Sequence, residues 1–366
     1  MRSALALACV ACLLVLLGGC ARPRVQAPQS RPAEVRAQIV RLLPADTRDR
    51  AGWATDLYAA FAALDIPPTD ANLCAALAVA GQESGFQVDP SVPGLGRIAR
   101  AELDRRAAQH HVPAFLVHAA LSLKSPDGRT YEQRLATART ERDLSRLYED
   151  FIGMVPLGRR LFDDDNPVRT GGPMQVSVAF AEDFARAHGY PYPVEGSIRH
   201  EVFGRRGSLY FGTAHLLAYP ADYPQMLYRF ADYNAGFYAS RNAAFQNAVA
   251  IAAGIPLDLD GDLLSYQGGT GATEAAVRTL ARRLDMDPGD IHDALAQGES
   301  PDLVRTDLYR RVYELAERSA GKPLPRAMLP HIRLESPKIT RKLTTAWFAH
   351  RVDGRYQRCL AQAHGG

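Results

Sequence analysis

The sequence predicts a mostly α-helical protein, and three observations support this. Apolar residues recur at intervals of three and four along most of the chain, a spacing that gathers them on one face of a helix. Glycine and proline separate these stretches, as they do where helices end. No segment of any length alternates apolar and polar residues as a half-buried strand does, and no repeat of fixed period is visible. With 366 residues, 47% of them hydrophobic, the chain can form one large or two modest globular domains.

Charge and cysteine content exclude several classes of partner. The formal net charge is only +3 and the basic residues are dispersed, so no strong field points to nucleic acid. Beyond the N-terminal segment the chain has no Cys-x-x-Cys motif and no cluster of cysteine with histidine, so a zinc site is not expected. The sequence therefore assigns no metal and no cofactor.

The N-terminus has the features of a targeting segment. Arg2 supplies a positive start, and residues 4–17 form an apolar and small-residue run that is too short for a comfortable transmembrane helix. Leu17-Gly18-Gly19-Cys20 follows and resembles the bacterial lipoprotein signal, in which the cysteine carries acyl chains such as palmitate and becomes the new N-terminus. The alternatives are an ordinary cleaved secretory signal and a short anchor helix.

The lipoprotein interpretation also predicts where the protein lies. Ala21, rather than Asp, at the second mature position fits sorting to the outer membrane in the general Gram-negative pattern, with the protein on the periplasmic face. Residues 21–33 are rich in Pro, Gln, Arg and Ser and cannot bury a core, so we expect them to be a flexible tether between lipid and folded domain.

Cys74 and Cys359 are the cysteines that remain beyond the targeting segment. Because the periplasm is oxidising, the two could form a disulfide that fastens the C-terminus onto the first core helix. The alternative is two separate buried thiols, each packed as a small apolar side chain. The sequence leaves both possibilities open.

Helical spacing and stop signals divide the rest of the chain. Thr69 or Asp70 can cap the helix that carries Glu83. The charge-rich region 95–152 is interpreted as three helices with a mainly structural role. The other expected helices cover residues 34–43, 48–64, a segment from about 177, 209–219, 222–236 and 237–253, and residues 254–366 are expected to be helical and more polar.

One stretch combines a buried helix end with a carboxylate. The residues that share the buried face are Leu73, Leu77, Ala80 and Ser84. Glu83 lies beside this face, and Gly85 is a good helix stop because glycine accepts a left-handed backbone. The negative end of the helix dipole and the apolar neighbours both favour a protonated Glu83, which suits a general acid. The alternative is an ordinary surface glutamate.

Three short stretches stand in a characteristic order. They are Glu83-Ser84 with Phe86, Gly172-Pro173-Met174-Gln175-Val176-Ser177, and Ala231-Asp232-Tyr233-Asn234-Ala235-Gly236. Together they resemble the lysozyme-like lytic transglycosylases of the soluble type. The whole chain also resembles a group of Gram-negative lipoproteins of undefined function that carry this domain. The resemblance implies a lysozyme-like core within residues 34–253 and a C-terminal extension, residues 254–366, packed on that core.

The chain departs from the family pattern in three places. Pro173 stands where leucine is usual, and Asp232 stands where alanine is usual. The span from Glu83 to Gly172 is far longer than in the family, so we expect a helical insertion at about residues 95–161. This insertion should lie at the rim of the groove, either as a lid or as a wall that narrows substrate choice.

The resemblance implies cleavage of peptidoglycan glycan strands between MurNAc and GlcNAc. Glu83 would protonate the leaving oxygen and then, as a base, accept the proton of the MurNAc 6-hydroxyl, which closes on C1 as a 1,6-anhydro end. Glycosidases usually need two carboxylates, and none near Glu83 in the sequence is compelling. Assistance by the acetamido group of the substrate removes that need.

The resemblance also implies roles for residues around Glu83. Ser84 and Gln175 are expected to form hydrogen bonds with the substrate or with Glu83, and Met174 is expected to line the sugar groove. Tyr233 would support the acid, and Asn234 would fix the backbone and the geometry of the acetamido group. For each of these five residues a core or capping role is the alternative. A later tyrosine near the acid is also typical of the family, and Tyr266 is a candidate by order alone.

Asp232 has two interpretations. Helical spacing favours a solvated face of its helix. If it instead points into the groove, it could activate water and make the enzyme a hydrolytic muramidase. A third hypothesis, from a different class, is a non-cleaving peptidoglycan-binding scaffold lipoprotein that kept the groove. The sequence does not identify protein partners, and it does not distinguish cleavage inside chains from cleavage at their ends.

Overall fold

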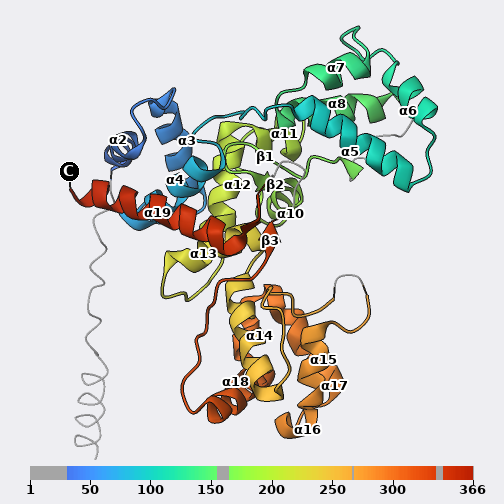
Figure 1. The fold of residues 1–366 in the computed structure, drawn as a ribbon. Helices are drawn as coiled ribbons and strands as arrows, with labels where there is room; N and C mark the ends of the chain where they lie inside the picture. The colour runs from blue at the N-terminus through green and yellow to red at the C-terminus, as the bar shows by residue number, and fades with distance from the viewer. Residues whose placement is uncertain (1–30, 155–164, 266–267, 335–340, 366) are drawn as a thin grey trace, which may run out of the picture.

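The computed structural model describes residues 31–154, 165–265, 268–334 and 341–365 (Figure 1). These residues are mostly helical, which confirms the predicted class. Two short antiparallel pairs add the described strands. The pairs are β1 (Thr170–Gly171) with β2 (Val176–Ser177), and β3 (Arg333–Leu334) with β4 (Leu343–Thr344).

The first hydrophobic core is built around one helix. Helix α4 (Asp70–Glu83) buries nine consecutive residues, Leu73 to Gly81, because it is apolar on all sides and other helices surround it. Thr69 caps its first turn as predicted, since its side chain accepts a hydrogen bond from the Asn72 backbone N–H. The other helices of this core are α2 (Pro32–Leu42), α3 (Arg50–Ala63), α10 (Val178–His188), α11 (Ile198–Phe203), α12 (Arg205–Leu217), α13 (Met226–Ala235) and α19 (Thr345–His364).

The last helix returns to the first core and is joined to it covalently. Helix α19 packs on both α4 and α13 and lies beside them in Figure 1. A disulfide connects Cys74 of α4 with Cys359 of α19, so of the two alternatives for these cysteines the structure contains the pair. The bridge spans 285 positions of sequence.

The insertion forms a separate helical group with its own small core. It contains α5 (Leu95–Gln109), α6 (Ala114–Leu121), α7 (Tyr131–Thr137) and α8 (Glu141–Gly153). Apolar side chains of α6 and α7 are buried together. The expectation of three helices is wrong because α7 and α8 are distinct. Thr140 and Asp143 form a reciprocal capping box that starts α8 anew.

A second hydrophobic core lies at the bottom of Figure 1. It is formed by α14 (Ala239–Ala253), α15 (Ala272–Thr279), α16 (Ala281–Leu284), α17 (Pro288–Leu295), α18 (Asp307–Ala320) and the 3-10 turns Ala296–Glu299 and Pro301–Arg305. The expected C-terminal extension, residues 254–366, therefore contributes to two different cores. Most join α14 in this second core, whereas α19 completes the first.

Several predicted features lie outside the described residues. They are the signal segment with Cys20, residues 21–30 of the tether, and Tyr266. The tether is shorter than expected, because α2 already begins at Pro32. Within the described ranges, no helix combines the length and apolar character that crossing a membrane requires.

The disulfide should contribute strongly to stability. Replacing Cys74 and Cys359 together by alanine should lower the free energy of unfolding by about 2–5 kcal/mol, because the bridge closes a very long loop and so restricts the unfolded chain. Urea unfolding followed by circular dichroism measures the loss. Reduced wild type should match the double variant, and equal unfolding midpoints for oxidised and reduced wild type would contradict this role.

Candidate functional site

Glu83 is the last residue of α4, at the end of the buried face predicted from its sequence. The helix stops there because Gly85 and Phe86 both adopt left-handed backbone angles, with φ of 58° and 62°. The Phe86 ring packs edge-on against Trp53 at 5.5 Å between centroids, which fixes the turn to the core. The carboxyl group of Glu83 is therefore carried on a rigid helix end.

The neighbour of Glu83 does not have the role expected of it. Ser84 is buried, and its hydroxyl donates a hydrogen bond to the Ala80 carbonyl one turn back. Its side chain thus caps the last turn of α4. The capping alternative describes this residue better than substrate contact does.

The second motif forms a tight turn between β1 and β2. Gly172 has φ of 71°, and a side chain there would collide with the Val202 carbonyl oxygen, so only glycine fits. Met174 is fully buried, and its thioether lies over Gly212, where any side chain would collide with it. The expectation that Met174 lines a sugar groove is therefore wrong, because the residue fills the core beneath the turn.

Gln175 connects the turn to the insertion. Its backbone has φ of 50°, which is unusual for a residue other than glycine. Its side-chain Nε2 donates to Glu141 Oε2 at 2.8 Å, and its Oε1 accepts from Thr170 Oγ1 at 3.1 Å. The amide of Gln175 is therefore held at both ends.

The third motif brings Tyr233 to the same place. The Tyr233 hydroxyl donates to the Met174 carbonyl at 2.7 Å, which ties α13 to the turn. Burial and the nearby Glu83 carboxylate raise the pKa of Tyr233 well above its ordinary value. Tyr233 therefore lies both at the turn that carries Gln175 and close enough to Glu83 for the charge of Glu83 to act on it. Asn234 instead accepts a hydrogen bond from Thr345 Oγ1 at 2.8 Å, at the start of α19.

Asp232 lies in the core, and the expectation of a solvated face is wrong. It is 1% exposed. Its Oδ2 accepts from the hydroxyls of Tyr219 and Tyr223 at 3.0 and 2.6 Å, and its Oδ1 accepts from the Ser240 backbone N–H at 2.7 Å. Both oxygens are engaged internally, so the carboxylate fastens the start of α14 and has no free oxygen with which to activate water.

The environment of Glu83 favours its protonated form. Its side chain is only partly accessible to solvent, and burial followed by the charge of Glu141 raises the pKa of Glu83 to about 8. The nearby His215 ring packs against Tyr233 at 4.9 Å and is neutral, because burial lowers its pKa to about 4. A carboxylic acid that keeps its proton at neutral pH can act as a general acid.

Glu141 is the residue that sequence reasoning missed. It is the first residue of α8, is 7% exposed, and is close enough for its charge to act on Glu83. The absence of a carboxylate near Glu83, inferred from sequence, is therefore corrected. The capping box at Thr140 and Asp143 was a readable signal that a helix starts here with Glu141 in its first turn. No sequence signal linked that helix start to Glu83.

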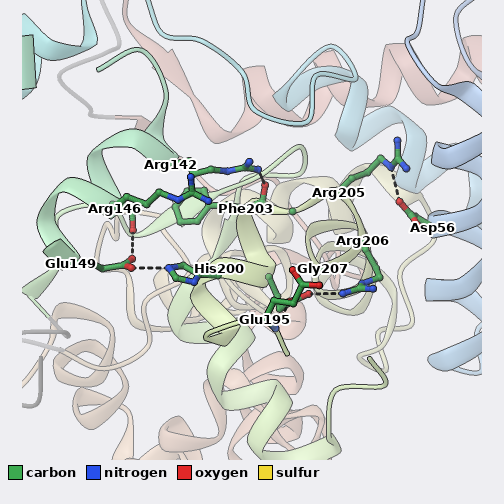
Figure 2. A pocket seen from close by; sticks show the side chains of 13 residues that line it. Asp56, Arg142, Arg146, Glu149, Glu195, His200, Phe203, Arg205, Arg206 and Gly207 are labelled. Atoms are coloured by element: carbon green, nitrogen blue, oxygen red, sulfur yellow. Dashed lines mark hydrogen bonds and ion pairs between the residues drawn. The ribbon is translucent and has the colours of Figure 1, made fainter. Parts of the chain in front are cut away.

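Two pockets flank α8. One of about 990 Å³ is lined mostly by apolar side chains of α5–α8, and Glu141 and Thr170 also line it. The other, of about 470 Å³, is polar and lies between α8 and the α11–α12 region; Figure 2 shows its arginine and glutamate side chains. Among the described residues, no group of three or more His, Cys, Asp or Glu is arranged to hold a metal ion.

These features define a mostly helical protein with a protonated glutamate at a helix end, beside a glutamine, a tyrosine and a second carboxylate. The chain belongs to the family described as "Protein of unknown function (DUF1615)", whose model matches residues 46–362. It is 54% identical over 355 residues to the uncharacterized protein YaiW of Escherichia coli strain K12, covering 95% of this chain and 96% of that protein. No solved structure matches. Neither description states an activity, which leaves the surroundings of Glu83 as the guide to function.

Replacing Glu83 by glutamine should stabilise the protein, and increasingly so as the pH rises. In the unfolded chain Glu83 loses its proton near pH 4.5, but in the folded protein only near pH 8. Between these values the folded state binds more protons, so the free energy of unfolding of wild type falls with rising pH. The gain from Glu83→Gln should reach on the order of 2–4 kcal/mol at pH 8 and vanish below pH 4. Urea unfolding across this range measures it, and a gain independent of pH would contradict the assignment.

Proposed function

We propose that the protein is a peptidoglycan lytic transglycosylase with a lysozyme-like core, in which Glu83 is the catalytic acid and then the base. The observation that carries the proposal is the protonated Glu83 at the end of α4, beside Gln175 and Tyr233. The three motifs that place these residues stand in the order typical of that family.

The reaction can be written for this one carboxyl group. Glu83 gives its proton to the oxygen between MurNAc and GlcNAc as the bond from that oxygen to C1 breaks. The acetamido carbonyl of the MurNAc stabilises the positive charge that develops at C1. The ionised Glu83 then takes the proton of the MurNAc 6-hydroxyl, whose oxygen bonds to C1. No water is consumed, and Glu83 is protonated again.

The surrounding residues suit this sequence of steps. The Gln175 amide, held by Glu141 and Thr170, connects the β1–β2 turn to the insertion, and Tyr233 fixes the same turn through the Met174 carbonyl. Internal contacts occupy Ser84, Met174 and Asn234, so these residues contribute rigidity rather than substrate binding. The proposal extends to the N-terminal segment: a lipid on Cys20 would hold the enzyme at the periplasmic face of the outer membrane, beside its substrate.

Two other outcomes are distinct from this reaction. A non-cleaving peptidoglycan-binding protein would use the same surface without proton transfer, and it is favoured by the number of motif residues engaged internally. A muramidase would add water at C1 and leave a hydrated reducing end. The internal contacts of Asp232 argue against that residue as the group that activates the water.

Digestion of purified sacculi tests the proposal. Wild type should release muropeptides with 1,6-anhydroMurNAc ends, detected by mass spectrometry, and Glu83→Gln should release at least about 100-fold less, the usual contribution of a general acid. Asp232→Asn is a control with the same chemical change away from Glu83 and should keep the anhydro product if it folds. Hydrated ends would identify a muramidase, and binding of sacculi without any product would identify a scaffold.

A further inference from the structure

The insertion delivers a carboxylate to the Glu83 site from a position that is far away in sequence. Glu141 opens α8, and its side chain is buried against the turn that holds Gln175. The 2.8 Å hydrogen bond from Gln175 Nε2 fixes one of its oxygens. The insertion therefore contacts the centre of the site and not its rim alone.

Contacts along the length of helix α8 hold it against neighbouring segments and so fix the position of Glu141. Arg142, next to Glu141, donates to the Phe203 carbonyl at the end of α11. One turn on, Ser145 Oγ accepts from Asn166 Nδ2 at 3.2 Å. Further along, Glu149 pairs with His200 at 2.7 Å, as Figure 2 shows. These contacts hold the first turn of α8 against the β1–β2 turn.

We propose that Glu141 is a positioning residue of the Glu83 site, that its carboxylate acts on Glu83 from the first turn of α8 beside the β1–β2 turn, and that the insertion is consequently part of the catalytic unit. The catalytic meaning of this inference rests on the proposed function. The charge relation between the two carboxyl groups does not, because it can be measured in the absence of any reaction.

The two carboxyl groups lie at opposite kinds of helix end. Glu83 sits at the C-terminal end of α4, where the helix dipole disfavours negative charge, and much of its surface is buried. Glu141 sits at the N-terminal end of α8, where the dipole favours negative charge, and it accepts an amide N–H. The two helix ends therefore act on the two carboxyl groups in opposite ways.

The other titratable groups around Glu83 do not offset this charge. Tyr233 of α13 stays protonated, since its pKa is raised well above the ordinary value, and His215 of α12 is neutral, since burial lowers its pKa to about 4. Arg355 of α19 donates to Gln82 Oε1, and its charge is not among the causes that shift the pKa of Glu83. The charge that acts on the Glu83 proton is that of Glu141.

The arrangement serves both halves of the proposed reaction. Before bond cleavage, the charge of Glu141 keeps Glu83 protonated to a higher pH than burial alone would. After cleavage, the same charge makes the ionised Glu83 a stronger base toward the 6-hydroxyl.

A stability titration tests the charge relation directly. The gain from Glu83→Gln is measured by urea unfolding between pH 4 and pH 9, in wild type and in Glu141→Gln. The gain stops rising at the titration midpoint of Glu83 in the folded protein, and this midpoint should move down by about one pH unit when Glu141 loses its charge. Glu132→Gln is the matched control, because this glutamate of the insertion is half-buried and paired with Arg100, so the midpoint should stay at the wild-type value.

The pH profile of sacculus digestion tests the catalytic consequence. In Glu141→Gln the alkaline limb of kcat/KM should move down by the same amount as the midpoint. A shifted midpoint without cleavage by wild type would sustain the charge relation and reject the proposed function. An unshifted midpoint in folded Glu141→Gln would overturn the inference. Glu141→Met, whose side chain suits the adjoining apolar pocket, is the second neutral variant, and failure of both to fold would make Glu141 purely structural and likewise overturn it.

Discussion

The retention of a proton by Glu83 is the constraint on which the rest of the site depends. A charged carboxylate at this helix end would lack water on most sides and would face both the dipole of α4 and the charge of Glu141. The protonated form avoids this cost, and the end of α4 stays in place because the other helices of the first core enclose that helix. The stability of the fold and the proposed chemistry therefore both depend on the Glu83 carboxyl group, because the burial that disfavours its charged form also keeps it protonated and able to act as an acid.

Much of the architecture around this group could be read from local sequence. The capping of α4 by Thr69, its buried face and its glycine stop depend on residues within a few turns of each other, and such short-range physics is visible in the order of the residues. The meeting of Glu83, Gln175 and Tyr233 was predictable for a different reason. The three motifs stand in the same order as in the family that they resemble, and in that family they form one site, so the resemblance implies that the three stretches meet in space.

The residues that sequence reasoning placed wrongly, or did not find, depend on distant partners. Met174 is buried because Gly212 leaves room for its thioether, and Asp232 is buried because the tyrosines at 219 and 223 satisfy it. Helical periodicity cannot reveal either partner. Glu141 was overlooked because its importance arises only when the insertion folds back onto the β1–β2 turn. A charged residue in a charge-rich region gives no local sign that it will be enclosed.

The disulfide between Cys74 and Cys359 determines what happens when a protease cuts the chain. Almost every connecting segment of the chain, including those that join the insertion and the second core to the first, lies inside the loop that this bond closes. A single cut by a protease in any of those segments therefore cannot release a fragment. The two pieces stay joined at α4 and α19, through a bond on the same helix that carries Glu83 at its other end, and the nicked protein can keep its site assembled.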